Sequence, residues 1–325
     1  MPTTPHKPHS GYWTTGAANN APPSEAPSLH LGHPSDRRFA MHIDPARLWK
    51  SDTPAHVVVL DAECRYDHVV HGRYLAAERF SPADVADLDP RDRRYDPRVT
   101  PRWPCQKIVT LSWLVLTDGD DGLRPVRMET RGCPEFDEAG IVAAFLTDMA
   151  QLGRVQLTSW GGFHADMPRI MLAAVAAGLR LPPSLAGLHS PWRREASGHC
   201  DLMSEMCGGA KNAHLAEVAA KLGVPAKITC RPDQVSRLMD QGKWSSVKAV
   251  AEGDVLSTTL LLMRWRHLLG GSVSTLEATQ RLTTFVSEHL SHRPYAADWQ
   301  RYGAEILSQA FAIETAKVEE LIPSP

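Results

Sequence analysis

One short segment, residues 56–61 (HVVVLD), restricts the fold of this chain more than any other. Polar and apolar residues do not alternate in it, so a strand formed by this segment would be apolar on both faces. A strand of this kind is stable in the centre of a sheet that helices cover on both sides. The segment therefore predicts an α/β domain with this strand at its centre.

The pattern along the rest of the chain supports this prediction. Turn residues at 118–122 separate two further apolar segments, 107–116 and 124–130, which predicts a β-hairpin. Residue spacing and chain breakers predict a helix over 136–152, a strand over 154–159 and helices over 167–178, 214–222, 234–269 (in two pieces around Gly242), 274–290 and 297–320. Residues 64–106 show little pattern, and we interpret them as a functional insertion.

The chain divides into three predicted regions. Residues 1–36 are rich in Pro, His, Ser, Thr and Asn and are expected to form a disordered tail. Residues 37–270 contain the strands and form the predicted α/β domain, and residues 271–325 form a helical C-terminal extension. The chemistry is therefore expected in residues 37–270.

Composition excludes some classes of protein. The formal charge of −2 rules out a globally basic nucleic-acid coat protein, but not an enzyme with a locally acidic site. Arginines between residues 91 and 102 alternate with aspartates, which predicts a surface of mixed charge. The six cysteines form no C-x-x-C pair, and no apolar run approaches the roughly 18 residues of a membrane span. We expect a cytoplasmic protein with free thiols, no secretion signal and no membrane segment.

Asp61 and Glu63 follow the predicted central strand directly. Residues i and i+2 of a strand project to the same face, so both carboxylates are expected to point to one place. Open α/β sheets bind ligands beyond the carboxyl ends of their strands, and Mg²⁺ or Mn²⁺ would neutralise such a pair. A solvated strand end explains the same two residues without a metal.

A second candidate is Asp166, in the segment Ser159-Trp-Gly-Gly-Phe-His-Ala-Asp166 between a predicted strand and a predicted helix. The glycines allow a sharp turn of the backbone. Asp166 lies at the expected helix start, so it is either a ligand or an N-capping residue. His164 is expected to pack or to form hydrogen bonds rather than bind a metal.

A third candidate is Asp254, which precedes an almost wholly apolar stretch of a predicted buried helix. An unpaired carboxylate is costly in such a place. Three partners are possible: a metal ion, an arginine, or backbone N–H groups if the helix restarts near Gly253.

The order of these segments resembles the DEDD superfamily of 3′-to-5′ exonucleases, most closely a bacterial family of predicted exonucleases related to the exonuclease domain of DNA polymerase B. The similarity covers roughly residues 55–268 and includes Val59–Glu63, Trp160–Asp166, Asp201-Leu-Met, Leu222-Gly-Val-Pro-Ala-Lys227 and Glu252-Gly-Asp254-Val. Extra residues lie between Phe163 and Asp166. The resemblance implies a ribonuclease H-like mixed sheet flanked by helices.

The resemblance also implies catalytic roles. Asp61 would lie between two divalent metal ions, Mg²⁺ or Mn²⁺, with Glu63 and Asp254 completing one metal position and Asp166 holding the second. The activity would be hydrolysis of phosphodiester bonds at the 3′ end of single-stranded DNA. No protein partner is predicted.

Three further residues are candidates for substrate binding. Trp160 and Phe163 could stack on bases, with core packing as the alternative for each. Lys227 could reach a phosphate, as could Lys243, with a solvated surface position as the alternative.

One position departs from the resemblance. The tyrosine-type branch has a Tyr four residues before the last Asp, where this chain has Val250, and the histidine-type branch has a His where this chain has Ala249. That side chain is thought to orient the attacking water. Tyr66, His164 and Glu252 are candidate substitutes. A weakened relative that binds nucleic acid without turnover is therefore one alternative. An RNA-trimming enzyme is another, because nothing in the residues selects deoxyribose over ribose.

Overall fold

The structure, a computed structural model, describes residues 56–86, 88–89, 91, 93, 96–189 and 198–321. All of them belong to one compact unit. The predicted disordered tail, residues 1–36, lies outside the described residues.

The centre of the fold is a five-stranded mixed sheet with the strand order β3-β2-β1-β4-β5. The strands are β1 (His56–Tyr66), β2 (Gln106–Gly119), β3 (Gly122–Gly132), β4 (Val155–Ser159) and β5 (His199–Asp201). β1 pairs antiparallel with β2 and parallel with β4, and β4 pairs parallel with β5. This is the predicted ribonuclease H-like mixed sheet, with β1 at its centre.

β1 is longer than predicted, and its two edges differ. On one side it pairs with β2 from His56 to Tyr66, with an irregularity between Glu63 and Cys64. On the other side its pairing with β4 ends at Val59, opposite Thr158. Beyond Val59, the pairing that the structure shows for β1 is with β2 alone, and Asp61 and Glu63 lie in this part of the strand.

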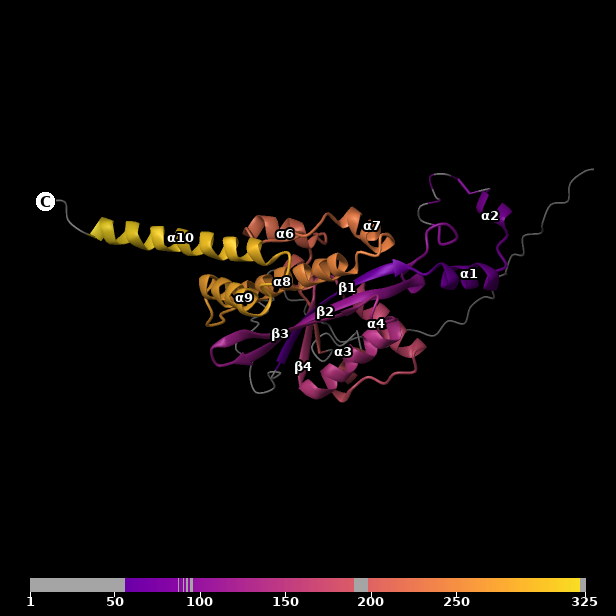
Figure 1. The fold of residues 1–325 in the computed structure, drawn as a ribbon, viewed down its shortest axis with the longest axis horizontal. Coiled ribbons are helices and arrows are strands. Elements are labelled where there is room, and N and C mark those ends of the chain that lie inside the picture. Colours follow the sequence, from indigo (N-terminus) through magenta and orange to yellow (C-terminus); the bar gives the residue numbers. More distant parts are fainter. Residues whose placement is uncertain are drawn as a thin grey trace, which may run out of the picture. The chain divides into compact units, whose positions relative to one another are not determined.

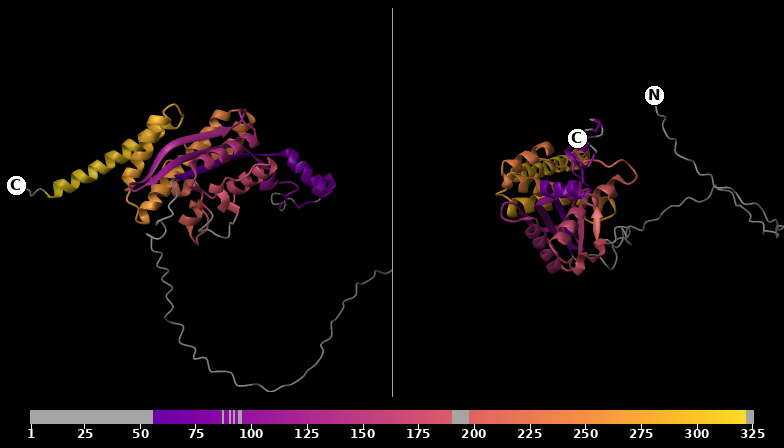
Figure 2. Two further views of the ribbon diagram at one scale, coloured as in Figure 1. Left: turned by 90° about the horizontal axis from the view of Figure 1, so that it is seen from below. Right: turned by 90° about the vertical axis from the view of Figure 1, so that its right-hand side faces the viewer.

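Helices cover both faces of the sheet, as Figures 1 and 2 show. α3 (Glu138–Leu152) and α4 (Asp166–Ala176) pack on one face, in a core that includes Val58 and Leu60. α8 (Trp244–Leu268) packs on the other face, in a core that includes Val57 and Val59. Alternate residues of β1 therefore enter two separate cores, which explains why the strand is apolar on both sides.

The predicted break at Gly242 is confirmed. α7 (Val235–Asp240) ends just before Gly242, which has φ of +66°, and α8 begins at Trp244. A glycine adopts this left-handed backbone without steric cost. The hairpin β2–β3 and the helices α6 (Leu215–Leu222), α9 (Thr275–His289) and α10 (Ala296–Leu321) also lie close to their predicted ranges.

Residues 64–106 contain more regular structure than predicted. β1 continues to Tyr66, and α1 (His68–Ala77) follows, with Asp67 as its N-cap. The same segment also contains two short elements that were not predicted, α2 (Pro82–Ala86) and a 3₁₀ turn at Trp103–Cys105. Later in the chain the prediction also missed the strand β5, the helix α5 (Leu202–Cys207) and the 3₁₀ turns at Pro183–His189 and Pro232–Gln234. All of these elements except α1 are short, so residue spacing gives little signal for them.

The C-terminal helices share a core with the sheet domain. Phe285 of α9 and Trp299 of α10 are buried in the same cluster as α8 and the sheet. The predicted division at residue 270 stays a prediction. Among the helices of the described residues, none combines the length and the apolar character that a membrane span requires.

Candidate metal centre

Asp61 and Glu63 project from β1 toward α8. They follow Val57 and Val59 on the same face of the strand, and those two valines pack in the core that contains α8. One carboxylate oxygen from each of Asp61, Glu63 and Asp254 lies within 4.8 Å of the others. The structure therefore brings together three of the four predicted ligands.

Asp254 reaches this group from within a continuous helix. α8 runs without interruption from Trp244 to Leu268, so Asp254 does not cap a restarted helix near Gly253, as one alternative proposed. Asp254 is 4% exposed, and its partner is the ammonium group of Lys227 instead of an arginine. A buried carboxylate is thus held beside two others with a single cation.

Asp166 lies at the first position of α4, next to the same cluster. The N-cap of this helix is Ala165, and Asp166 is therefore not the capping residue that one alternative proposed. A Cβ atom added to Gly162 would come within 2.2 Å of Ser159 Oγ and 3.0 Å of Asp166 Oδ2. Only glycine fits between β4 and this carboxylate, which explains its presence in the turn.

Asp201 holds the loop that carries Asp166, a function that the sequence did not reveal. It lies at the end of β5, beside the end of β4, and is 8% exposed. Its Oδ1 accepts a hydrogen bond from Gly161 N–H at 2.9 Å, and its Oδ2 accepts one from Phe163 N–H at 3.1 Å. The motif Asp201-Leu-Met was recognised only as part of the resemblance.

The carboxylates raise one another's pKa. Burial, followed by the charges of Asp254, Asp166 and Glu63, raises the pKa of Asp61 well above its ordinary value. Burial and Asp254 raise the pKa of Glu63 to about 7. Burial also raises the pKa of Asp166 to about 7, although Arg169 opposes the shift, and burial raises that of Asp254 against the effect of Lys227. Carboxylates placed in this way favour the approach of a cation.

Lys227 is placed beside the cluster by the loop after α6. Burial acts to lower the pKa of Lys227, but the charges of Asp254, Asp61 and Glu63 outweigh burial and raise it. The lysine was predicted as a phosphate contact. The structure shows that its ammonium group forms an ion pair with Asp254, while its side chain is partly exposed.

The position expected for a tyrosine lies in an apolar core. Val250 is 3% exposed and packs with Val109, Val247, Val235 and Met239. No hydrogen-bonding group is offered at this position, because valine has none.

Glu252 was predicted as a possible substitute for that tyrosine, and this prediction is wrong. Its carboxylate is fully buried and bound by Thr130, Tyr295 and Arg293, so it faces away from the cluster toward the C-terminal helices. Tyr66 and His164 are exposed, and no contact of either residue with the cluster is seen.

The aromatic candidates differ in their surroundings. Trp160 packs against the core that contains α8 and donates a hydrogen bond to Ala213 O at 3.3 Å, which favours the packing alternative. Phe163 is partly exposed, and its ring meets the ring of His164 edge-on, with 4.8 Å between the two ring centroids. Lys243 is exposed just before α8.

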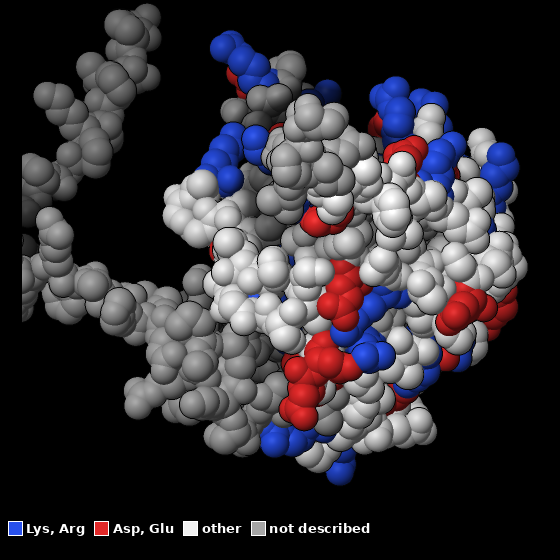
Figure 3. All heavy atoms as spheres, turned by 90° about the vertical axis from the view of Figure 1, so that its left-hand side faces the viewer, with Lys and Arg blue, Asp and Glu red and all other residues white. Residues whose placement is uncertain are grey.

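Charges on the described surface are mixed. Arg98 pairs with Asp96 at 2.8 Å, and Arg91 lies 3.7 Å from Asp89, as the alternating sequence predicted. On the face drawn in Figure 3, basic and acidic side chains likewise lie next to one another. This face is therefore not a broad basic surface for a nucleic-acid backbone.

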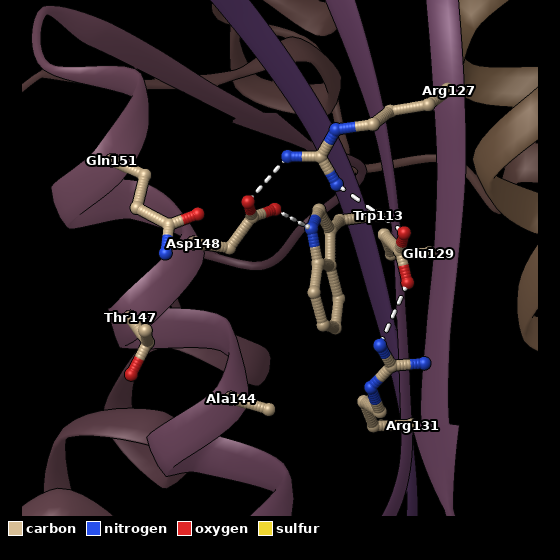
Figure 4. A pocket seen from close by; sticks show the side chains of 8 residues that line it. All are labelled: Trp113, Arg127, Glu129, Arg131, Ala144, Thr147, Asp148 and Gln151. Carbon is tan, nitrogen blue, oxygen red and sulfur yellow. Dashed lines mark hydrogen bonds and ion pairs between the residues drawn. The ribbon is translucent and has the colours of Figure 1, made fainter.

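A separate hollow lies between α3 and the edge strand β3 (Figure 4). Asp148 accepts a hydrogen bond from the indole of Trp113 at 2.6 Å and pairs with Arg127. Glu129 lies 3.4 Å from Arg127 and 3.0 Å from Arg131. Each arginine of this hollow already has an acidic partner, and none of the predicted site residues lines it.

The donor set of the carboxylate cluster fits a divalent metal. Carboxylate oxygens are the ligands that hard cations prefer, and the three residues come from two rigid elements, β1 and α8. Asp166 lies outside the group of three, yet its charge acts on Asp61 and Glu63. The three carboxylates could thus hold a divalent cation, with a fourth carboxylate beside them.

Two solved structures have partial similarity to this chain. One is the family B DNA polymerase from the hyperthermophilic archaeon Pyrobaculum calidifontis, with 20% identity and a TM-score of 0.37 over 70% of this chain and 27% of that one. The other is exonuclease I, with 10% identity and a TM-score of 0.34 over 73% of this chain and 45% of that one. The chain thus corresponds to less than half of either protein.

The sequence comparison is more specific. Among proteins with curated descriptions, none matches the chain. Residues 101–306, more than half of the chain, match a family described as predicted 3′-5′ exonucleases related to the exonuclease domain of PolB. The matched range includes Asp166, Lys227 and Asp254, and it begins after β1. By this match, the chain belongs to the family of predicted 3′-5′ exonucleases related to the exonuclease domain of PolB.

Proposed function

We propose that this protein is a metal-dependent 3′-5′ exonuclease that hydrolyses single-stranded DNA from its 3′ end. The observation that supports this most strongly is the meeting of Asp61, Glu63 and Asp254 within 4.8 Å, with Asp166 beside them. Four carboxylates from three elements with one nearby ammonium group are costly to a fold unless cations bind there.

The residues of the chain would act as follows. Asp61, Glu63 and Asp254 would bind one cation, Asp61 would also bind the second, and Asp166 would complete the second position. Two Mg²⁺ or Mn²⁺ ions would supply Lewis-acid activation of the attacking water and stabilise the departing 3′ oxygen. The rigid backbones of β1 and α8 would keep the ligands in place while the substrate strand moves.

Phe163 is the favoured residue for stacking on the terminal base. It is partly exposed, and Asp201 fixes the backbone of its loop close to Asp166. Trp160 is less suited because the core already holds its ring. The choice of DNA over RNA depends on contacts to the 2′ position of the sugar.

The direct test is degradation of a 5′-labelled single-stranded DNA in Mn²⁺, Mg²⁺ or EDTA. We expect a metal-dependent ladder of shortened products from the wild type. Asp166→Ala and Asp254→Asn should abolish the ladder, while Asp298→Asn in α10, which changes an acidic residue outside the cluster, should leave it unchanged. A 5′-labelled RNA of the same sequence decides between DNA and RNA.

Equal ladders from the wild type and Asp254→Asn would contradict the assignment of the cluster. Faster degradation of the RNA would contradict the choice of DNA.

The burial of Val250 favours a second candidate, an exonuclease-like module that binds nucleic acid with little turnover. Loss of a general base typically costs about 100- to 10,000-fold in rate. Retention of the DNA by the wild type without any ladder would support this candidate. Val250→Tyr tests the cause: a gain in rate would show that the missing hydroxyl limits turnover, whereas overpacking of the apolar cluster predicts a loss of about 1–3 kcal/mol in stability.

A further inference from the structure

Lys227 occupies an unusual place for a lysine. Its ammonium group forms an ion pair with Asp254 Oδ2, and its side chain is 27% exposed. The charges of Asp61 and Glu63 also act on it. The ammonium group of Lys227 therefore lies against Asp61, Glu63 and Asp254, three of the carboxylates that the proposed function assigns to metal ions.

The backbone around Lys227 holds it there. Lys227 has φ of +53°, a conformation that is uncommon for any residue other than glycine. Two residues earlier, Pro225 O accepts a hydrogen bond at 2.7 Å from the hydroxyl group of Ser257, which lies three residues after Asp254 on α8. Val224 is buried in the same core as α8. The loop is thus docked on the helix that carries Asp254.

We propose that Lys227 is a resident counter-ion of the metal centre, which neutralises Asp254 and has to leave that carboxylate when a divalent cation binds it. This inference rests on the proposed function, because it takes Asp254 as a metal ligand. An ammonium group and a divalent cation repel each other, and both cannot hold the same carboxylate oxygen at close range.

Competition has a distinctive consequence for metal affinity. If Lys227 only supported the shape of the site, its removal would weaken metal binding, because the ligands would lose their arrangement. If Lys227 competes with the cation, its removal strengthens metal binding. Whether removal of Lys227 strengthens or weakens metal binding therefore distinguishes a competing lysine from a supporting one.

Release would also give the lysine a second contact. An ammonium group displaced from Asp254 would remain beside Asp61 and Glu63, the carboxylates that would hold the metals. Metal loading would then convert Lys227 from a partner of Asp254 into a phosphate contact. This accounts for a lysine that the sequence predicted as a phosphate ligand and that the structure shows bound to a carboxylate.

The test is a titration of the EDTA-stripped full chain with Mn²⁺ at pH 8 by calorimetry, for the wild type, Lys227→Gln and Lys221→Gln. Lys221 is an exposed lysine of α6, so its substitution makes the same change of charge outside the cluster. We expect Lys227→Gln to bind Mn²⁺ about tenfold more tightly than the wild type, within the usual range of coupling between two sites, and Lys221→Gln to match the wild type. Affinity that is unchanged or weaker in Lys227→Gln would overturn the proposal.

Two further measurements support the interpretation. Lys227→Arg keeps the charge, so tighter Mn²⁺ binding in this variant would overturn the proposal by showing that disturbance of the loop is the cause. The rise of Tm on addition of Mn²⁺ should be larger for Lys227→Gln than for the wild type. If circular dichroism shows that Lys227→Gln does not fold, Lys227→Met, of similar length, replaces it in both measurements.

The DNA ladder assay on the same preparations separates this inference from the proposed function. Absence of metal-dependent degradation by the wild type would contradict the nuclease, while the order of Mn²⁺ affinities would still decide the function of Lys227.

Discussion

Two carboxylates on α8, only two residues apart, have opposite surroundings. Glu252 is fully buried and meets a complete set of partners: Thr130 at 2.7 Å, Tyr295 at 2.8 Å and Arg293 at 2.8 Å. Asp254 faces the other way, toward Asp61 and Glu63, and its ion-pair partner is the ammonium group of Lys227. One helix therefore has a stabilising carboxylate on one side and a mutually repelling cluster on the other.

The difference shows how the environment of a carboxylate separates structure from chemistry. The partners of Glu252 connect α8 to β3 and to the segment between α9 and α10, so this carboxylate fixes the C-terminal helices on the domain. The carboxylates around Asp254 raise one another's pKa, and we propose that a metal cation neutralises them. Four predictions test this contrast.

The largest effect is expected from Glu252→Ala. Removal of the Glu252 carboxylate leaves the hydroxyl group of the buried Tyr295 without its acceptor and Arg293, which is 32% exposed, without its carboxylate, and should lower the free energy of unfolding by about 3 kcal/mol. Chemical denaturation followed by circular dichroism measures this change. The affinity for Mn²⁺ of the fraction that stays folded should be that of the wild type, and a parallel loss of metal binding would contradict the separation of the two regions.

Asp254→Asn should show the reverse pattern. Metal affinity should fall by at least about 10- to 100-fold, since even groups that only support a ligand have effects of this size. In EDTA the free energy of unfolding should stay within about 1 kcal/mol of the wild type, because the substitution removes a repelling charge and Lys227 can still reach solvent. A loss of stability as large as that of Glu252→Ala would show that Asp254 is mainly structural.

The stability of the EDTA-stripped protein should depend on pH. Glu63 and Asp166 have pKa values near 7 in the folded protein and near 4 when unfolded, so the folded state keeps protons that the unfolded chain has lost. The free energy of unfolding should therefore fall from about pH 4 to pH 7, by at most about 1.4 kcal/mol per pH unit for each group. Saturating Mn²⁺ should remove most of this fall, and a flat profile in EDTA would contradict the repulsion within the cluster.

The smallest effect is expected from Tyr295→Phe. The substitution removes one hydrogen bond to Glu252 and leaves Thr130 and Arg293 in place, so the cost should be about 1 kcal/mol. Thermal unfolding of this variant measures it, and the pH profile in EDTA should stay that of the wild type. A changed profile would mean that the two sides of α8 are coupled.

Much of the fold was predictable because its signals are local. The apolar strand at 56–61, the turn at 118–122 and the break at Gly242 each follow from a few neighbouring residues. β5 was missed because three residues give no periodicity, and its place in the sheet depends on pairing with β4. The helix at 68–77 was missed because none of its residues is buried, so it has no apolar stripe.

The sequence by itself determined the kinds of groups at the centre: the carboxylates of Asp61, Glu63, Asp166 and Asp254, the glycines before Asp166, and the lysine at 227. Tertiary structure alone decided their partners. It turned Glu252 toward Arg293 and Tyr295, set Asp201 beneath the loop of Asp166, enclosed Val250 in a core and placed Lys227 on Asp254. The reason is physical: residue type and local spacing act over a few positions, whereas pairing, burial and charge repulsion depend on segments that only folding brings together.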